Sequence, residues 1–405
     1  MDESTMLEMA KLVKGLLGID KSSENALRNK NTQLVRGYSG YDKQTGAIGV
    51  PIYQSSMFVH EKYGTSTGFG YGRYGNPTRL ELEDTLAMLE HGKKAWAYSS
   101  GMTAESILMK LLKTGDHVIV SDDLYGGTFR LFTLTYAEQY GLEFSYVPTD
   151  DLEAVKQAIK PNTKAIFVET PSNPIMKVTD IQATADLIHN QGGLLIVDNT
   201  FLTPYFQTPI DLGADIVVHS GTKFLSGHND VLSGFIVIKD ESLIERIFTL
   251  TMTEGGVLGP FDSYLMLRSI KTLGLRLERQ QENAFKLFEF LSKHPKVERV
   301  YYVGDPNHPQ YELSKRQSTG FGSMISFKLK NAAEVPDLLN SLKLILFAES
   351  LGGCETFLTY PLMQTHGAIP EELRKRVGVD EALLRLSVGI EDAGEIIADL
   401  EQALG

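Results

Sequence analysis

The chain has 405 residues, of which 42% are hydrophobic and 22% are charged, so it can form more than one hydrophobic core and has an ordinary globular composition. A formal net charge of -12 argues against binding to nucleic acids or acidic membranes, and no apolar run approaches the length that spans a bilayer. With Cys354 as its single cysteine and no signal-like pattern at its start, the chain is expected in the cytoplasm, without an intrachain disulfide.

The first part of the chain is predicted to be a short amphipathic helix followed by an irregular arm. Residues 1–30 alternate apolar and charged positions at helical spacing. Residues 37–78 are rich in Gly, Tyr and Ser and show no periodicity, and so long an irregular segment is usually functional or buried in an interface. Asn76-Pro77-Thr78 then has the pattern of a helix start.

Five apolar segments follow, separated by stretches with helical periodicity. They are residues 94–98, 117–120, 165–169, 194–198 and 216–218. This alternation predicts an α/β fold with a mostly parallel sheet and helices on both faces. Ligands of such sheets bind at the carboxyl ends of the strands, which is where the motifs described below lie.

The last third of the chain is predicted to form a smaller α+β domain. Residues 261–291 have the pattern of one long helix that leads out of the sheet domain. Residues 323–329 alternate like a half-exposed strand, and helices are expected at 332–343 and 392–404. We therefore predict an N-terminal extension and arm (1–78), a large α/β domain (79–260) and a C-terminal α+β domain (261–405).

Two strand ends carry the residues that first indicate chemistry. Lys223 follows a buried strand, in a turn that also contains Ser220 and Thr222, and Asp198 ends the preceding strand. A partly desolvated lysine is a nucleophile toward an aldehyde. Together with a carboxylate that can keep a pyridine nitrogen protonated, this lysine predicts a site for pyridoxal phosphate.

Other residues fit the remaining parts of that cofactor and its substrate. The helix start at Gly101-Met102, the hydroxyls of Ser220 and Thr222, and the guanidinium of Arg73 could hold a phosphate. Tyr125 could stack on the pyridine ring. Arg385 lies in an apolar strand-like run and could bind a carboxylate, although a structural salt bridge is an equal alternative.

The remaining histidines and the cysteine carry no clear signal. His219, His228 and His366 lack the clustered spacing of metal ligands, so we expect them to be structural and predict no metal site. Cys354, in a Gly-Gly-Cys-Glu segment, is also interpreted as structural.

At this point the chain resembles the trans-sulfuration enzymes, the pyridoxal-phosphate family of cysteine and methionine metabolism. The resemblance runs from about Thr32 to the C-terminus. The motifs that carry it are Tyr71-Gly-Arg73, Asn76-Pro77-Thr78, Ser100-Gly101-Met102, Tyr125-Gly126, Glu169-Thr-Pro-Ser-Asn173-Pro174, Val197-Asp198-Asn199-Thr200, His219-Ser-Gly-Thr-Lys223, Ser350-Leu351-Gly352-Gly353 and Arg385-Leu-Ser-Val-Gly389. It implies the aspartate-aminotransferase-like fold (fold type I of pyridoxal-phosphate enzymes).

The resemblance also implies a role for each matching position. Lys223 would bind the cofactor covalently and move protons, Asp198 would pair with the pyridine nitrogen, and Tyr125 would stack on the ring and act as an acid or base. Asn173 would contact the ring hydroxyl or the substrate carboxylate. The phosphate would be held by Gly101, Met102, Ser220 and Thr222, together with Tyr71 and Arg73 of the neighbouring subunit. Arg385, helped by Ser350, would bind the substrate carboxylate, and the assembly would be a homotetramer of active dimers.

Two positions bear on the subgroup. Gly127 stands where methionine γ-lyases carry a cysteine, and Glu349 resembles the acid found in members that handle cystathionine. An acid there could meet the distal ammonium of cystathionine, or of cysteine as an incoming nucleophile. We therefore expect cystathionine γ-lyase-like cleavage first, then γ-synthase, then β-lyase, with methionine γ-lyase less favoured.

Two readings from other classes remain open at this stage. A dinucleotide-binding oxidoreductase could share the sheet, but the chain has no Gly-x-Gly-x-x-Gly turn after its first strand. A pyridoxal-phosphate fold that has lost activity could serve as a binding protein, although the complete set of site residues argues against it.

Overall fold

The five predicted strands lie in one seven-stranded sheet in the computed structural model, which describes residues 24–367 and 369–405. The strand order is β1-β7-β6-β5-β4-β2-β3. β3, β2, β4, β5 and β6 are parallel, whereas β7 runs antiparallel to both of its neighbours, β6 and β1. The strands are β1 (Lys94–Tyr98), β2 (His117–Ser121), β3 (Glu143–Val147), β4 (Thr163–Glu169), β5 (Leu194–Asp198), β6 (Ile216–Ser220) and β7 (Gly234–Ile238). The predicted mostly parallel sheet is confirmed, but β3 and β7 had not been predicted.

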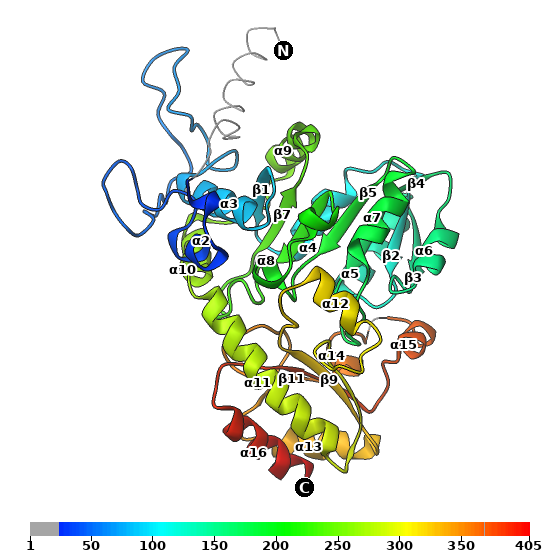
Figure 1. The fold of residues 1–405 in the computed structure, drawn as a ribbon. Helices are drawn as coiled ribbons and strands as arrows, with labels where there is room; N and C mark the ends of the chain where they lie inside the picture. Colours follow the sequence, from blue (N-terminus) through cyan, green and yellow to red (C-terminus); the bar gives the residue numbers. More distant parts are fainter. Residues whose placement is uncertain (1–23, 368) are drawn as a thin grey trace.

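Helices cover both faces of this sheet because the strand residues are apolar on both sides (Figure 1). In β5, Ile196 packs in a cluster with Ile107 of α4 (Gly101–Met109). Its neighbour Val197 points the other way and packs in a cluster with Ile188 of α7 (Ile181–His189). Successive side chains of a strand point to opposite faces, so a strand that is apolar throughout must be covered twice.

The smaller C-terminal sheet has five strands in the order β10-β11-β12-β9-β8. They are β8 (Val297–Tyr301), β9 (Met324–Leu329), β10 (Leu346–Phe347), β11 (Phe357–Thr359) and β12 (Leu383–Ser387). Only the β10–β11 pair of these described strands is parallel. Helices pack on this sheet, as predicted for an α+β unit, and α11 (Leu273–Lys293) runs along it (Figure 1).

The other helices connect and cover the two sheets. They are α2 (Lys30–Arg36), α3 (Pro77–Leu89), α5 (Gly126–Arg130), α6 (Leu152–Ala158), α8 (Thr203–Phe206), α9 (Ile244–Glu254), α10 (Pro260–Ile270), α11 (Leu273–Lys293), α12 (Tyr311–Gln317), α13 (Val335–Ser341), α14 (Pro361–Gln364), α15 (Glu371–Val377) and α16 (Ala393–Leu404). Residues 131–137 form a π-helical turn, and short 3₁₀ turns occur at residues 24–27, 209–212, 241–243 and 332–334. The domain boundaries at 78 and 260 remain a prediction.

Two details of the predicted C-terminal part are wrong. The single helix expected at 261–291 is divided into α10 and α11 by a turn at Lys271 and Thr272, where the Thr272 hydroxyl donates to the Ser269 carbonyl. The strand expected to be half exposed, β9, is buried along almost its whole length. β9 is central in its sheet, and Ser326 reaches across to donate to the Pro174 carbonyl of the large unit.

The N-terminal arm is irregular, as predicted. Between α2 and α3 the structure has no helix, and a single bridge pairs Met57 with Tyr71. The arm forms the long loops that extend from the body in Figure 1, and Asn76 caps the start of α3 with its side chain. The helix expected within residues 1–30 falls mostly outside the described residues.

Candidate active site

A cavity of about 180 Å³ lies at the carboxyl ends of the central parallel strands. Its lining comes from the ends of β4, β5 and β6, the start of α4 and the turns that follow the strands. The lining residues are Ser100, Gly101, Met102, Glu105, Tyr125, Glu169, Asn173, Asp198, Thr200, Phe201, Ser220, Thr222, Lys223, Leu232 and Leu351. The cavity thus brings together eight residues that the sequence singled out, from five separate segments of the chain.

Lys223 places its amine in a poorly hydrated position. Its Nζ donates a hydrogen bond of 2.7 Å to Ser350 Oγ, which comes from the C-terminal unit. Burial, and secondly the positive charge of Arg385, lower the pKa of Lys223 to about 8, while Glu349 opposes the shift. About a tenth of this lysine is therefore a neutral, nucleophilic amine at pH 7, far more than for a lysine with an ordinary pKa.

Asp198 supplies a carboxylate at the end of β5. Its Oδ1 accepts a hydrogen bond of 2.9 Å from the Thr200 backbone N–H. Burial raises the pKa of Asp198, so a cationic partner in the cavity is needed to keep this carboxylate fully ionised. Burial and the nearby Asp198 raise the pKa of Glu169 well above its usual range, so Asp198 is the member of this pair that carries the charge.

The start of α4 forms the end of the cavity that suits an anion. Ser100 caps the helix by accepting from the Thr103 N–H, which leaves the N–H groups of Gly101 and Met102 available at the helix start. A Cβ at Gly101 would lie 3.1 Å from Cβ of Ser220, so glycine allows β6 and the helix start to approach. The Ser220 and Thr222 side chains line the same cavity.

Arg385 connects the cavity to the C-terminal unit. It lies in the middle of β12 and is only 1% exposed. Its Nη1 donates to Asn173 Oδ1 at 2.8 Å and its Nη2 to the Ser350 carbonyl at 2.8 Å, while Nε has no partner among the described residues. Burial lowers the pKa of Arg385 to about 10, so the guanidinium remains charged at neutral pH and needs an anion.

Tyr125 and Glu349 lie at the more open side of the site. Tyr125 lines the cavity and is 41% exposed, and its backbone N–H donates to Glu169 Oε2 at 2.9 Å. Glu349 is exposed and is not among the lining residues, but its charge acts on Lys223. Both side chains can therefore meet a molecule that enters from solvent.

Tyr71 and Arg73 are the two predicted cofactor-binding residues that do not line this cavity. They line a separate hollow of about 500 Å³ with the loop at residues 255–260. The Arg73 guanidinium lies over the rings of Tyr71 and Tyr74, at 5.6 and 5.3 Å, and donates to the Met252 carbonyl. Their placement leaves open the predicted role in a neighbouring subunit.

Several lining residues were not predicted as site residues. Glu169 and Thr200 lie within motifs quoted above, so their neighbours in the chain could have indicated them. Glu105 has no such signal, because a glutamate within a helix is normally a surface residue. It reaches the cavity only because α4 lies against the sheet.

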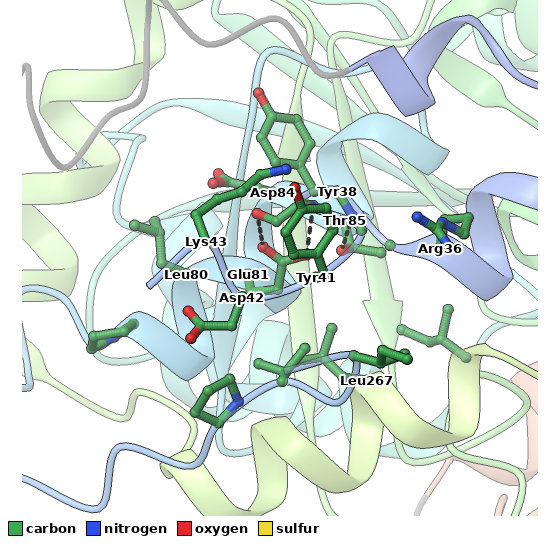
Figure 2. A pocket seen from close by; sticks show the side chains of 18 of the residues that line it. Arg36, Tyr38, Tyr41, Asp42, Lys43, Leu80, Glu81, Asp84, Thr85 and Leu267 are labelled. Atoms are coloured by element: carbon green, nitrogen blue, oxygen red, sulfur yellow. Dashed lines mark hydrogen bonds between the residues drawn. The ribbon is translucent and has the colours of Figure 1, made fainter. Parts of the chain in front are cut away.

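A second hollow, of about 270 Å³, lies between the N-terminal segment, α3 and α10 (Figure 2). Tyr38 N–H donates to Thr85 Oγ1 at 3.0 Å, and Ser39 N–H donates to Glu81 Oε1 at 2.9 Å, which anchors the arm on α3. This hollow is larger than the cavity at the strand ends, but Lys223, Asp198 and Arg385 are not among its lining residues. We therefore place the chemistry at the strand ends.

The residues present fit pyridoxal phosphate. The lysine with a lowered pKa suits the cofactor aldehyde, the buried Asp198 lacks the cation that a pyridinium would supply, and the start of α4 suits the phosphate. Among residues 24–367 and 369–405, no group of three His, Cys, Asp or Glu side chains could hold a metal ion. In the same part of the chain, the helices are too short or too polar to cross a membrane.

Comparisons with known proteins support this fit over almost the whole chain. The sequence pattern of the family described as Cys/Met metabolism PLP-dependent enzyme matches residues 31–405. The chain is 48% identical to a cystathionine gamma-lyase of Bacillus subtilis over 375 residues, covering 93% of this chain and 99% of that protein. It is 49% identical to a cystathionine gamma-synthase of Haemophilus influenzae over 373 residues, covering 92% and 97%.

Solved structures show the same relationship. The cystathionine gamma-lyase from Lactobacillus plantarum, complexed with L-serine, has a TM-score of 0.90 and 44% identity, covering 93% of this chain and 98% of that one. The expected fold type I is therefore confirmed, as is pyridoxal phosphate as the cofactor, and the oxidoreductase reading is excluded. The chain belongs to the Cys/Met metabolism family of pyridoxal-phosphate-dependent enzymes, whose members include cystathionine γ-lyases, γ-synthases and β-lyases.

Proposed function

We propose that this enzyme is a cystathionine γ-lyase, which converts L-cystathionine and water to cysteine, 2-oxobutyrate and ammonia. The observation that carries the proposal is the position of Glu349, an exposed acid whose charge acts on Lys223 beside the buried Arg385. A guanidinium for the α-carboxylate and an acid for the distal ammonium suit an amino acid with charged groups at both ends. The B. subtilis relative named as a γ-lyase supports the same choice.

The proposed roles follow from the geometry of the site. When bound, pyridoxal phosphate supplies the electron sink that makes the Cα and Cβ protons of the amino acid acidic. Arg385 holds the substrate carboxylate and Asn173 orients that guanidinium. Lys223 Nζ would remove the Cα proton, give it up to the bound cofactor and then, as a neutral amine again, remove a Cβ proton. Ser350 Oγ fixes the position of the amine. Tyr125 gives a proton to the departing sulfur.

The environment of Gly127 disfavours a methionine γ-lyase. A Cβ at this position would lie 2.3 Å from Cε1 of Tyr125, so a side chain there would displace the tyrosine ring. The present position of the Tyr125 ring thus requires glycine at position 127.

A γ-synthase and a β-lyase are the second and third choices. Replacement by a thiol and elimination with water share the same proton transfers by Lys223, so the same residues could serve either reaction. Relatives with these names match the chain to a similar extent, which is why the reaction must be measured.

The decisive measurement is the keto acid released when the cofactor-loaded enzyme is given L-cystathionine. We expect 2-oxobutyrate, together with cysteine in equal amount. Pyruvate would show a β-lyase and contradict γ-elimination. No reaction with cystathionine, combined with turnover of an O-acylhomoserine and cysteine, would show a γ-synthase.

We also propose that the enzyme is a homotetramer of active dimers in the cytoplasm. The arm carries exposed apolar side chains, with Ile48 81%, Met57 71% and Val59 79% exposed, and a partner subunit would bury them. Tyr71 and Arg73 lie on this arm and do not line the cavity of their own chain. A dimer in which each arm reaches the phosphate end of the other subunit's cavity explains both features.

Subunit mixing tests this arrangement. Arg73→Ala and Lys223→Ala should each be nearly inactive alone, but mixed dimers contain one site with both native residues. After subunit exchange in equal amounts, about a quarter of the wild-type activity is expected, because half of the dimers are mixed and each mixed dimer has one intact site out of two. The oligomeric mass is a separate test, in which light scattering should give the mass of four chains. If subunit exchange is demonstrated but no activity is recovered, the shared site is contradicted.

A further inference from the structure

Glu105 is a carboxylic acid inside the cofactor cavity to which no role has been given above. It lies in α4, one turn after Met102, and is only 4% exposed. Its neighbours Ala104 and Ile107 pack into the hydrophobic cluster beneath the sheet. Glu105 itself lines the cavity with Asp198 and Lys223. A glutamate in such a place must have a polar partner or destabilise the fold.

Only one of its two carboxyl oxygens has a partner in the protein. Oε1 accepts a hydrogen bond of 3.0 Å from the hydroxyl of Thr128, which is itself buried in α5. Oε2 is fully buried and has no hydrogen-bond partner among the described residues. Buried polar atoms are almost always paired in native proteins, so an unpaired oxygen beside a ligand cavity indicates a partner that the ligand brings.

The charges around Glu105 decide whether Oε2 accepts or donates. Burial, and secondly the negative charge of Asp198, raise the pKa of Glu105 well above its usual range. The low polarity of the surroundings and the charge of Asp198 therefore favour the protonated, neutral form of this carboxyl. Oε1 accepts from Thr128, so the unpartnered Oε2 is the oxygen that would carry the proton, and Glu105, which lines the cavity, would be a neutral donor there.

We propose that Glu105 is a further cofactor-binding residue, whose Oε2 donates a hydrogen bond to pyridoxal phosphate in the cavity. Thr128 orients the carboxyl from the other side, and Asp198 provides the single carboxylate that the pyridinium needs. In its neutral form, Glu105 adds no second negative charge beside Asp198. Such a charge would repel the anionic cofactor. This role concerns the cofactor alone, so it stands whichever sulfur amino acid is the substrate.

Two substitutions of nearly equal size separate donation from packing. Glu105→Gln keeps an acceptor for Thr128 and a donor for the cavity, whereas Glu105→Met fills the space without either. The affinity of each apoprotein for pyridoxal phosphate is measured by titration, followed by fluorescence and by the visible absorbance of the bound cofactor. We expect Glu105→Gln to bind within about twofold of wild type and Glu105→Met to bind about tenfold more weakly, the factor for one lost hydrogen bond.

Two results of this titration would overturn the proposal. If Glu105→Met binds the cofactor as tightly as wild type, Glu105 only fills space. If Glu105→Gln loses as much affinity as Glu105→Met, donation from a neutral group is wrong. Melting curves of the three apoproteins show whether each variant is folded before its affinity is compared.

A measurement on the native apoprotein keeps the proposal testable if Glu105→Met does not fold. The infrared difference spectrum on adding pyridoxal phosphate should contain a shift of the C=O band of a protonated carboxyl. This shift is expected because donation of a hydrogen bond by the Glu105 O–H weakens the C=O bond of the same carboxyl group. The same shift should be missing in Glu105→Gln. An unchanged carboxyl region in the wild-type protein, or the same band shift in both proteins, would overturn the assignment.

Discussion

Replacement of Lys223 by alanine is expected to lower turnover by about 10³-fold or more, because one amine both attaches the cofactor and transfers the protons. The Nζ atom lies in the cavity at 2.7 Å from Ser350 Oγ, and its pKa is lowered to about 8. Lys223 is the one lysine among the described residues that line the cavity. The visible absorbance that belongs to the lysine-bound cofactor should disappear together with activity.

The measurement compares absorbance spectra and turnover of wild type, Lys223→Ala and a matched control, Lys239→Ala. Lys239 follows β7 and is exposed, so its removal should change neither quantity. A Lys223→Ala protein that kept the absorbance of a covalently attached cofactor would show that another amine serves. Adding a small primary amine should restore part of the activity only in the Lys223 variant.

Replacement of Arg385 by leucine should lower kcat/KM by about 10²- to 10³-fold, mainly through a higher KM. Arg385 is the buried cation next to the cavity, with Nη1 on Asn173 and Nη2 on the Ser350 carbonyl. Its Nε has no partner among the described residues, so the guanidinium keeps N–H groups for a substrate carboxylate. Loss of this group removes the charge that holds the α-carboxylate in place.

Because Arg385 is also part of the packing between the two units, the variant needs a control that separates binding from folding. Arg385→Lys keeps the charge but loses the planar pair of donors, so its KM should lie between wild type and Arg385→Leu. Cofactor absorbance and melting temperature show whether each protein is folded. A KM for the amino acid that does not change in folded Arg385→Leu would exclude a role in carboxylate binding.

Local patterns determined much of the fold. The apolar runs around Val197 and Val217 predicted buried strands, and Asn76-Pro77 predicted the start of α3, because strand and helix periods and caps depend on residues that are close in the chain. The same locality explains the error at 261–291. Helical periodicity continues through Lys271 and Thr272, so it could not show that the chain turns between α10 and α11.

The sequence by itself indicated the cofactor and the positions of Lys223 and Asp198, because residues at the ends of parallel strands must meet at one edge of the sheet. The tertiary structure alone decided which distant groups complete the site. Ser350 meets Lys223 and Arg385 meets Asn173 across 127 and 212 positions of the chain. Glu105 becomes a buried neutral acid only when α4 packs against the sheet beside Asp198, since burial and charge belong to the folded environment and not to the residue type.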